Sequence, residues 1–519
     1  MKKRQMIAAV MAMVISVALC ACSGSKTTED SNKGTNKEES SSNTLSEGTP
    51  VSGGRVVFGM TQTLTSLDPH VETDAGTRDM VFNLYEGLVK PASDGDLVPA
   101  VASDVDISDD AKVYTFTLRD GITFHDGTAV TVEDVKYSID RYAEIQGESS
   151  AFSIVSDVTI ADEKTIVVTL KESYSEFLSL MVLAIIPQAN EDITGNPIGT
   201  GPFKMASYSP GENIVLEKYE GYWKEGYPYL DQVEFKFIAD VDTAFVELQA
   251  GTIDMMKYLT TDQVAALDDT YTIYEGNMNL VHGMFFNHEY EPLANQKVRQ
   301  ALCYAIDRDS VNQFLFGGKS KLIGSHMIPT LGKYYEEGAE NIYSYDPAKA
   351  KELLSEAGYA DGFDLEITVS SSYSQHVKTA EIIVEQLSQV GINATVKKVE
   401  WGTWLEEVYQ GGKFQSTVIG FDGTLMPGDF IMRYKSDSSK NFMHYANEEF
   451  DRVFTEAYET VDDDKKVELY KKAQMILAED AAAVYIEDPA NLVAVNKKFA
   501  GYTFYPTSAE DMSLVYMVK

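Results

Sequence analysis

The chain has 519 residues and carries 43 Lys and Arg residues against 80 Asp and Glu residues, a formal charge of −37 at pH 7. So acidic a protein is a poor match for nucleic acid or a bare anionic lipid surface, because both are negatively charged. The length suits about three domains of ordinary size, and three cysteines are too few for a disulfide framework.

The first residues have the pattern of a bacterial lipoprotein signal. Lys2 to Arg4 are basic, Met6 to Leu19 form an apolar run, and Leu19-Cys20-Ala21-Cys22 follows. The run is too short to span a bilayer as a helix, and its ending resembles the lipobox, whose cysteine is lipidated and becomes the first mature residue. We expect a signal at residues 1–21 and a lipid on Cys22, with an ordinary cleaved signal as the alternative. Cleavage removes three basic residues and no acidic ones, so the formal charge becomes −40.

Residues 22–50 predict a flexible tether. Leu45 is their only large apolar residue, so the segment buries too little surface to offset its ordering entropy. Beyond the signal, no apolar run reaches the length of about 18 residues that a membrane-spanning helix needs. We therefore expect a globular body held by its lipid alone at the outer face of the cytoplasmic membrane.

Strand patterns dominate the first half of the mature chain. We expect strands at 55–59, 113–118, 122–124, 165–170, 213–219, 232–238 and 253–255, and helices at 77–89 and 242–250. Thr131 and Asp134 resemble a capping box that opens a further helix.

The stretch from Val281 to Arg308 predicts a strand that runs into a helix. Residues 281–286 have the two-residue period of an extended segment. After a turn at Pro292 an apolar stripe with the helical period begins, and Asn295 is placed to cap it. Cys303 lies on that stripe, so we expect a buried packing residue.

Beyond this stretch helices and strands alternate. Asp346 and Pro347 suit the start of a helix and Gly358 its end. Further strands are expected at 363–369, 392–399, 417–421, 482–486 and 492–495, and helices at 380–387, 401–408, 450–458 and 466–477. Helices between strands predict an α/β protein with a covered parallel or mixed sheet.

The sequence lacks the patterns of the common enzyme classes. Its seven histidines include no His-Glu-x-x-His pair, and His282 and His288, which suit one face of an extended segment, lack further ligands. Gly317 to Ser320 resembles the end of a phosphate loop, but Gln313 replaces its first glycine. No Gly-x-Ser-x-Gly elbow is present either. We therefore expect no catalytic residues, no metal and no cofactor.

Five segments stand in an ordered series along the mature chain. They are Leu67-Asp68-Pro69 with Tyr85-Glu86-Gly87-Leu88, residues 114–141, Gly199 to Phe203, Val281 to Arg308, and residues 345–359. In order and spacing they resemble the family 5 extracellular solute-binding proteins of ABC transporters, which include oligopeptide, dipeptide and nickel receptors. The resemblance covers nearly everything from residue 54 onward.

The resemblance implies a two-lobed α/β fold of the periplasmic-binding-protein type, with a hinge and an extra domain inserted in the first lobe. The first lobe would use residues 51–90, 198–286 and 488–519, the inserted domain residues 91–197, and the second lobe residues 287–487. The stretch from Val281 then becomes a crossover between lobes, with His282, Gly283 and Asn287 as hinge candidates. We expect a monomeric receptor and not an enzyme. It would pass a small ligand, with a peptide as the first expectation from this resemblance, to an ABC permease and its ATPase.

The resemblance also points to ligand-binding residues. In oligopeptide receptors a Trp that follows Glu and an aromatic residue at the end of a later strand flank the peptide, and Trp401 and Phe421 match these places. Trp401 fits core packing equally well, since it lies on an apolar stripe. The Asp that pairs with the peptide amino group is replaced here by Thr424, whereas Asp422 directly follows Phe421.

We therefore expect Asp422, Gly423 and Thr424 at the site, with Ser66 as a further candidate. Dipeptide receptors hold the ligand carboxylate with an Arg where this chain has Ser370 to Ser372, so Arg433 is the substitute candidate. These departures keep open a receptor for a non-peptide solute, such as an opine, an oligosaccharide or a metal chelate, and a sensory protein on the same fold.

Overall fold

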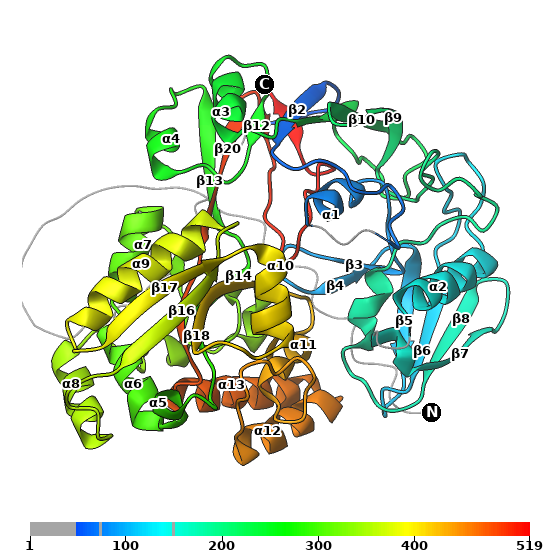
Figure 1. The fold of residues 1–519 in the computed structure, drawn as a ribbon. Helices are drawn as coiled ribbons and strands as arrows, with labels where there is room; N and C mark the ends of the chain where they lie inside the picture. The colour runs from blue at the N-terminus through cyan, green and yellow to red at the C-terminus, as the bar shows by residue number, and fades with distance from the viewer. Residues whose placement is uncertain (1–47, 72–74, 148–150) are drawn as a thin grey trace, which may run out of the picture. The chain divides into compact units, whose positions relative to one another are not determined.

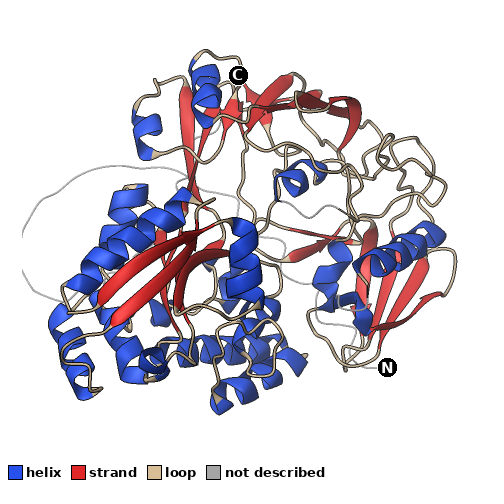
Figure 2. Ribbon diagram, viewed as in Figure 1, coloured by secondary structure: helices blue, strands red, loops and turns tan. Residues whose placement is uncertain are grey.

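A computed structural model describes residues 48–71, 75–147 and 151–519. The expected signal, the lipid attachment site at Cys22 and nearly all of the tether lie outside these residues. Within the described ranges no helix has the length and apolar character required to cross a membrane. The same ranges contain five sheets and many helices, in a mixed α/β arrangement (Figure 2).

A seven-stranded sheet brings together strands that are far apart in the sequence. Its order is β13-β20-β12-β2-β11-β10-β9. The strands are β2 (Arg55–Met60), β9 (Phe203–Ser209), β10 (Asn213–Lys218), β11 (Gln232–Phe237), β12 (Met255–Met256), β13 (Tyr271–Asn277) and β20 (Ala490–Asn496). β2 runs parallel to β11 and β12, and β20 runs antiparallel to β12 and β13. The C-terminal part of the chain thus returns to the sheet that β2 began.

Short elements surround this sheet. They are the helices α1 (Ala75–Val81), α3 (Val241–Gln249) and α4 (Thr261–Ala265), and the three-stranded sheet of β1 (Pro50–Val51), β22 (Tyr516–Val518) and β21 (Phe499–Ala500). The pair β3 (Val89–Pro91) and β4 (Leu97–Pro99) packs instead with the core of the four-stranded sheet described below.

The predicted helix over 77–89 was wrong beyond Val81. The backbone oxygens of Asn83 and Leu84 accept hydrogen bonds from Phe203 N at 3.1 Å and Gly201 N at 3.0 Å. A Cβ on Gly201 would lie only 2.5 Å from Asn83 O, so the glycine allows an approach that takes these carbonyls out of a helix.

A four-stranded sheet lies wholly within residues 91–197, the segment predicted as the inserted domain. Its order is β5-β6-β8-β7. The elements are β5 (Ala102–Ile107), β6 (Val113–Leu118), β7 (Val155–Ile160), β8 (Thr165–Leu170), α2 (Val132–Gln146), η1 (Ala151–Ile154) and η2 (Phe177–Val182). The predicted capping box of Thr131 and Asp134 is present at α2.

The predicted strand over 122–124 forms only one bridge, between Thr123 and Ala129. Phe124 N donates to Thr128 O at 2.8 Å, and Gly127 N donates to Phe124 O at 2.8 Å. The segment therefore closes on itself as a tight turn and does not extend the sheet.

A six-stranded sheet forms the second large layer, in the order β15-β19-β14-β18-β16-β17. Its strands are β14 (Leu280–Phe286), β15 (Lys321–Leu322), β16 (Asp364–Ser370), β17 (Asn393–Val399), β18 (Ser416–Asp422) and β19 (Ala483–Asp488). The helices of this part are α5 (Glu291–Ala294), α6 (Gln296–Ala305), α7 (Arg308–Phe316), η3 (Pro329–Tyr334), η4 (Glu337–Asn341), α8 (Pro347–Glu356), α9 (Ser374–Ser388), α10 (Trp401–Thr403), the π-helical η5 (Trp404–Gln410), α11 (Pro427–Ile431), η6 (Met432–Tyr434), α12 (Glu448–Glu459) and α13 (Asp463–Glu479).

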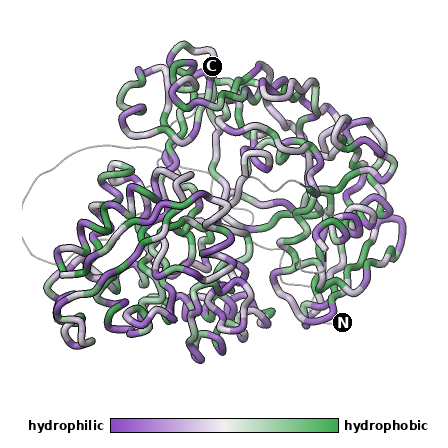
Figure 3. The backbone as a smooth tube through the Cα atoms, in the orientation of Figure 1, coloured by the Kyte–Doolittle hydropathy of each residue, from purple (hydrophilic) through white to green (hydrophobic). Residues whose placement is uncertain are grey.

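Helices cover the six-stranded sheet as the apolar stripes predict. In Figure 1, α9 lies along β16 and β17, and Figure 3 shows hydrophobic and hydrophilic stretches alternating along the helices, as expected when one face is buried. Asn295 caps α6 by accepting from Lys297 N at 3.0 Å, and Cys303 is a buried free thiol, 6% exposed. Both predictions for this helix are confirmed.

β14 has the predicted alternation, but it lies in a different sheet from the one expected. Val281 and Phe285 pack into one core, whereas Met284 and Phe286 pack into another. The strand pairs with β18 over its whole length and with β19 from His282 to Phe285. The chain enters the six-stranded sheet at β14, so we move the predicted lobe boundary from residue 286 to the start of this strand.

The connections between the two large sheets are short and adjacent. Met278 and Asn279 join β13 to β14, and Pro489 joins β19 to β20. Met278 N donates to Pro489 O at 2.8 Å, and Leu280 N donates to the buried Asp488 Oδ1 at 3.0 Å. Asn279 has a φ of 59°, the left-handed conformation that Asn tolerates.

The residues predicted for the hinge lie elsewhere. His282 and Gly283 are inside β14, and a Cβ on Gly283 would lie 2.5 Å from Val484 O, so this glycine serves close strand packing. Asn287 Nδ2 donates to Phe414 O at 2.8 Å, which ties the end of β14 to the segment before β18. We therefore move the hinge prediction to Met278, Asn279 and Pro489.

Candidate functional site

A cavity of about 440 Å³ opens where separate parts of the chain meet. One wall comes from α1 and the segment between Pro69 and Pro91, and a second from Tyr142, Phe152 and residues 179–184. Residues 422–426, here called the cavity loop, form a third, and Thr507, Ser508 and Asp511 complete the lining. This volume lies in the range of small-ligand sites, about 300–1,000 Å³.

The lining combines apolar walls with few charges. Its larger apolar residues are Val81, Phe82, Tyr85, Tyr142, Phe152, Leu180, Val182, Leu183, Leu425 and Met426. Charged groups at the wall are Arg78, Glu86, Lys90, Asp422 and Asp511, and hydroxyls come from Ser179, Thr424, Thr507 and Ser508. Such a lining orients a ligand by its polar groups and binds its bulk by apolar contact.

Asp422 ends β18 and begins the cavity loop. Enclosure by its surroundings raises the pKa of this carboxyl above its usual value, and the positive charge of Arg78 opposes the shift. Throughout the described ranges, the structure shows no hydrogen bond to the Asp422 carboxylate, and the side chain stays accessible within the cavity. A bound cation would therefore meet a carboxylate that no protein donor already occupies.

The cavity loop is held by its neighbours. Gly423 N donates to Asn279 O at 2.7 Å, so the loop is tied to the connection between the two large sheets. Thr424 Oγ1 accepts from Met426 N at 3.1 Å and donates to Met426 O at 2.9 Å, which closes a turn. The loop thus presents Asp422 from a fixed backbone.

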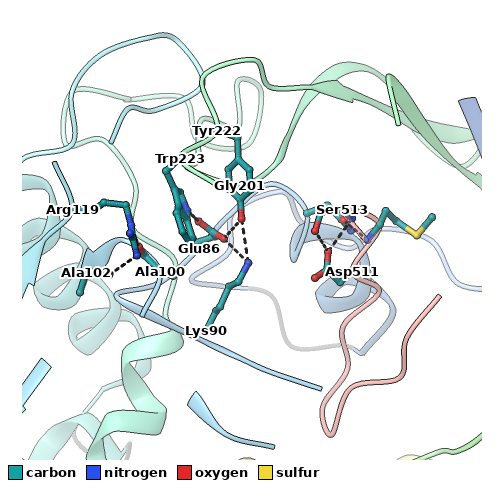
Figure 4. Close-up of polar contacts among 12 residues, drawn as sticks. Glu86, Lys90, Ala100, Ala102, Arg119, Gly201, Tyr222, Trp223, Asp511 and Ser513 are labelled. Atoms are coloured by element: carbon teal, nitrogen blue, oxygen red, sulfur yellow. Dashed lines mark hydrogen bonds and ion pairs between the residues drawn. The ribbon is translucent and has the colours of Figure 1, made fainter. Parts of the chain in front are cut away.

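Glu86 and Lys90 form a closed network in the first wall (Figure 4). Glu86 Oε1 accepts from Lys90 Nζ at 2.8 Å and from Tyr222 OH at 2.7 Å, while Oε2 accepts from Trp223 Nε1 at 2.6 Å. Burial acts to lower the pKa of Lys90, but the charge and hydrogen bond of Glu86, together with Tyr222 and Asp511, outweigh it and raise this pKa well above the usual value. Because Lys90 already pairs with Glu86, we infer that this network stabilises the wall of the cavity and does not bind the ligand.

Asp511 is also engaged by protein groups. Its Oδ1 accepts from Ser513 N at 2.9 Å and from Ser513 Oγ at 2.5 Å, as Figure 4 shows, and its Oδ2 accepts from Tyr505 OH at 2.7 Å. These bonds leave Asp422 as the acidic group of the lining that is best placed to receive a ligand.

The structure brings together only part of the predicted site. Asp422, Gly423 and Thr424 line the cavity, whereas Trp401, Phe421, Arg433 and Ser66 are not among its lining residues. Trp401 stacks on Trp404 with ring centroids 5.1 Å apart, which favours the core-packing alternative.

Two other predicted residues pair with each other. The Arg433 guanidinium lies 3.9 Å above the Phe421 ring centroid. Ser66 Oγ accepts from Asp68 N at 3.0 Å and serves a local turn.

Sequence reasoning missed the walls contributed by α1, by Tyr142 and Phe152, and by residues 179–184. These residues lie on α1, on α2, on η1 and on or directly after η2, in separate parts of the sequence, and no local pattern indicates that they converge. One signal was present, because Tyr85-Glu86-Gly87 belongs to a segment that carries the family resemblance and lines the cavity.

Comparison with known proteins identifies the family. Residues 96–442 match the model of the bacterial extracellular solute-binding proteins, family 5. The chain belongs to this family. It is 28% identical over 487 residues to the glutathione-binding protein GsiB of Pectobacterium atrosepticum, a match that covers 88% of this chain and 94% of the relative.

Solved structures show the same fold. The ABC transporter-associated binding protein DppA of Helicobacter pylori, in complex with the peptide STSA, is 26% identical with a TM-score of 0.73, covering 90% of this chain and 99% of that one. AgaA of A. tumefaciens R10, in complex with agropinic acid, is 29% identical with a TM-score of 0.72, covering 89% and 99%.

Membership in this family confirms the fold class and the general function expected from the sequence. The family consists of extracellular solute-binding receptors, so the chain is a binding protein of ABC transport and not an enzyme. Its fold is the two-lobed α/β fold of the periplasmic binding proteins.

Proposed function

We propose that this family 5 receptor is anchored by a lipid on Cys22 and captures a short peptide, which it delivers to an ABC permease and its ATPase. The observation that carries the ligand class is the cavity itself. It combines an Asp422 carboxylate without a hydrogen-bond donor, the cationic Arg78 and a mainly apolar lining.

Two opposite charges suit a zwitterion. A peptide amino group would bind Asp422 at the end of β18, while its carboxylate would bind Arg78 on α1. Charge-assisted hydrogen bonds of this kind are about twice as strong as neutral ones. Because Arg78 lies on α1 and Asp422 ends a strand of the six-stranded sheet, a ligand that binds both would hold two walls of the cavity together.

The comparisons support a peptide in first place. GsiB is named for glutathione binding, and the DppA structure holds the peptide STSA. The cavity volume of about 440 Å³ suits a ligand of a few residues better than a long chain.

A non-peptide solute is the second candidate, because AgaA at 29% identity holds agropinic acid. An opine also carries carboxylate and amine groups, so Asp422 and Arg78 alone do not separate the two classes.

Mass spectrometry of the solute carried through purification tests the ligand class directly. If the solute is a peptide, calorimetry then compares the affinities of its free, N-acetylated and C-amidated forms. Glutathione and an opine are measured in the same way. Asp422→Asn should weaken the free peptide by about 10- to 100-fold, the worth of one charged hydrogen bond, and leave the N-acetylated form nearly unchanged.

Asp361→Asn, at an exposed position away from the cavity, is the matched control and should bind as the wild type does. Binding of a non-peptide solute alone would overturn the peptide proposal. Equal loss of the free and N-acetylated peptides in Asp422→Asn would remove the assigned amine partner.

Labelling with a radioactive fatty acid tests the anchor. The wild-type protein should incorporate the label and Cys22→Ser should not, whereas an unlabelled wild type would contradict the lipoprotein assignment.

A further inference from the structure

Residues 174–176 follow β8 and are anchored by Tyr174 and Phe177 to the core of the four-stranded sheet. Tyr114 OH donates to Tyr174 O at 2.7 Å, and the rings of Tyr114 and Phe177 lie 4.9 Å apart between centroids. Tyr174 and Phe177 both belong to the buried core of this sheet. The backbone that carries Glu176 therefore moves with the four-stranded sheet.

The Glu176 side chain leaves that core for the helices of the other large layer. It is only 5% exposed. Its Oε1 accepts from Gly428 N at 2.9 Å and from Tyr470 OH at 2.7 Å, and its Oε2 lies 3.2 Å from Gly428 N. Gly428 is in the first turn of α11, where amide donors have no partner within the helix.

The two residues before Glu176 reinforce this contact. Tyr174 OH donates to Met426 Sδ at 3.2 Å, and its ring stacks on Tyr458 with centroids 5.0 Å apart. Ser175 Oγ donates to Tyr458 O at 3.4 Å. Three consecutive residues between β8 and η2 thus contact α11, α12, α13 and the end of the cavity loop.

Gly428 fits this arrangement closely. A Cβ at this position would lie 2.4 Å from Tyr470 Oη and 3.0 Å from both carboxylate oxygens of Glu176. A side chain there would therefore separate the partners, which makes the glycine part of the contact.

The contact lies at the edge of the ligand cavity. Gly428 follows the cavity loop by two residues, and η2, which begins directly after Glu176, contributes Ser179 and Leu180 to the opposite wall. We infer that Glu176 is a positioning residue that fastens the cavity loop to the wall facing it and so retains a bound ligand. This inference rests on the proposed function only in taking the cavity as the ligand site.

A ligand enclosed between these walls leaves only when they separate, which breaks the hydrogen bonds of Glu176. Removing the carboxylate should therefore speed dissociation by about 10- to 100-fold, as expected for a charged hydrogen bond. Association should change far less, because most differences among variants of one site arise in dissociation.

Stopped-flow dissociation of the co-purified solute tests this expectation with Glu176→Ala and Glu176→Gln. The Gln variant keeps the shape and one acceptor, so its rate should fall between those of the wild type and Glu176→Ala. Glu163→Gln, an exposed acid on the turn between β7 and β8, is the control and should match the wild type. An unchanged dissociation rate in Glu176→Ala would overturn the inference even if that variant is less stable.

Amide hydrogen exchange of the unliganded protein provides a readout that needs no ligand. The Gly428 amide should exchange faster in Glu176→Ala than in the wild type or Glu163→Gln, and equal exchange would also overturn the inference. If the receptor binds no peptide, only the proposed ligand class is refuted. The role of Glu176 is still tested by hydrogen exchange at Gly428 and by the dissociation rate of the solute that co-purifies.

Discussion

The wall that carries Arg78 depends on a buried group of charges. Lys257, only 8% exposed, contacts Asp79 on α1 and lies 2.9 Å from Glu510 Oε1, and Tyr502 OH donates to Glu510 Oε2 at 2.9 Å. Asp79 is adjacent to Arg78, and Glu510 is adjacent to Asp511, so the group links two parts of the cavity lining. We predict that Lys257→Met destabilises the protein and weakens ligand binding together.

The magnitude follows from what the substitution leaves behind. Without the lysine, Asp79 and Glu510 remain buried as two acids with no cation between them. Breaking a buried ion pair in this way costs about 3–5 kcal/mol in free energy of unfolding, far more than the loss of a surface pair. The triple change Asp79→Asn, Lys257→Met and Glu510→Gln removes every charge and should recover most of that cost.

The pH dependence has a defined sign. Burial already raises the pKa of Asp79 to about 6, against the opposing charge of Lys257. A buried carboxyl with a raised pKa loses stability as the pH rises from its unfolded value through its folded value. Because Lys257→Met removes the opposing charge, its penalty should be larger near pH 8 than near pH 5, by about 1.4 kcal/mol for each unit that the pKa gains.

Urea denaturation followed by far-ultraviolet circular dichroism at both pH values measures these differences, and calorimetry measures ligand affinity at neutral pH. Lys164→Met, which removes an exposed lysine paired with Asp120, is the control and should cost less than about 1 kcal/mol. A cost for Lys257→Met below about 1 kcal/mol at pH 8, or one that grows toward pH 5, would refute the reasoning.

Three further predictions concern the site and the connections between sheets. Affinity for a free peptide should fall as the pH drops through the raised pKa of Asp422, while affinity for its N-acetylated form should change less. Calorimetry from neutral to acid pH measures both affinities. An equal fall for the two forms would contradict the pairing of the peptide amino group with Asp422. Gly283→Ala should cost about 1–3 kcal/mol in urea denaturation, because its methyl group meets the Val484 carbonyl; an unchanged midpoint would count against close packing there. Asn279→Ala should be less stable than Asn279→Gly by about 1 kcal/mol. Both variants lose the hydrogen bonds to Tyr505 and Thr330, but only alanine is strained at a φ of 59°. Equal stability of the two variants would argue that the backbone relaxes.

Local patterns predicted the elements whose cause is local. The capping box at Thr131, the Asn295 cap and the alternation along β14 depend on neighbours within a few residues, and the structure contains all three. The family resemblance supplied the fold class, which periodicity alone would have limited to a general α/β type.

Features that depend on distant partners were missed. The length of α1 depends on Gly201, which approaches Asn83 from far along the chain. The sheet to which β14 belongs could not be predicted locally either, because it is decided by pairing with β18 and β19, which follow much later. Likewise, Arg78 and the walls from Tyr142 and Phe152 join the site only through tertiary packing.

The site therefore owes its shape to contacts at both ends of one short loop. At its start, Gly423 N donates to Asn279 O in the connection between the large sheets. Just past its end, Gly428 N donates to Glu176, which directly precedes η2. Asp422 thus projects from a loop that is tied on one side to the proposed hinge and on the other to the facing wall. If the lobes separate about Asn279, the Glu176 contact must break together with those of Tyr174 and Ser175 beside it, so ligand retention and lobe closure would depend on the same contacts.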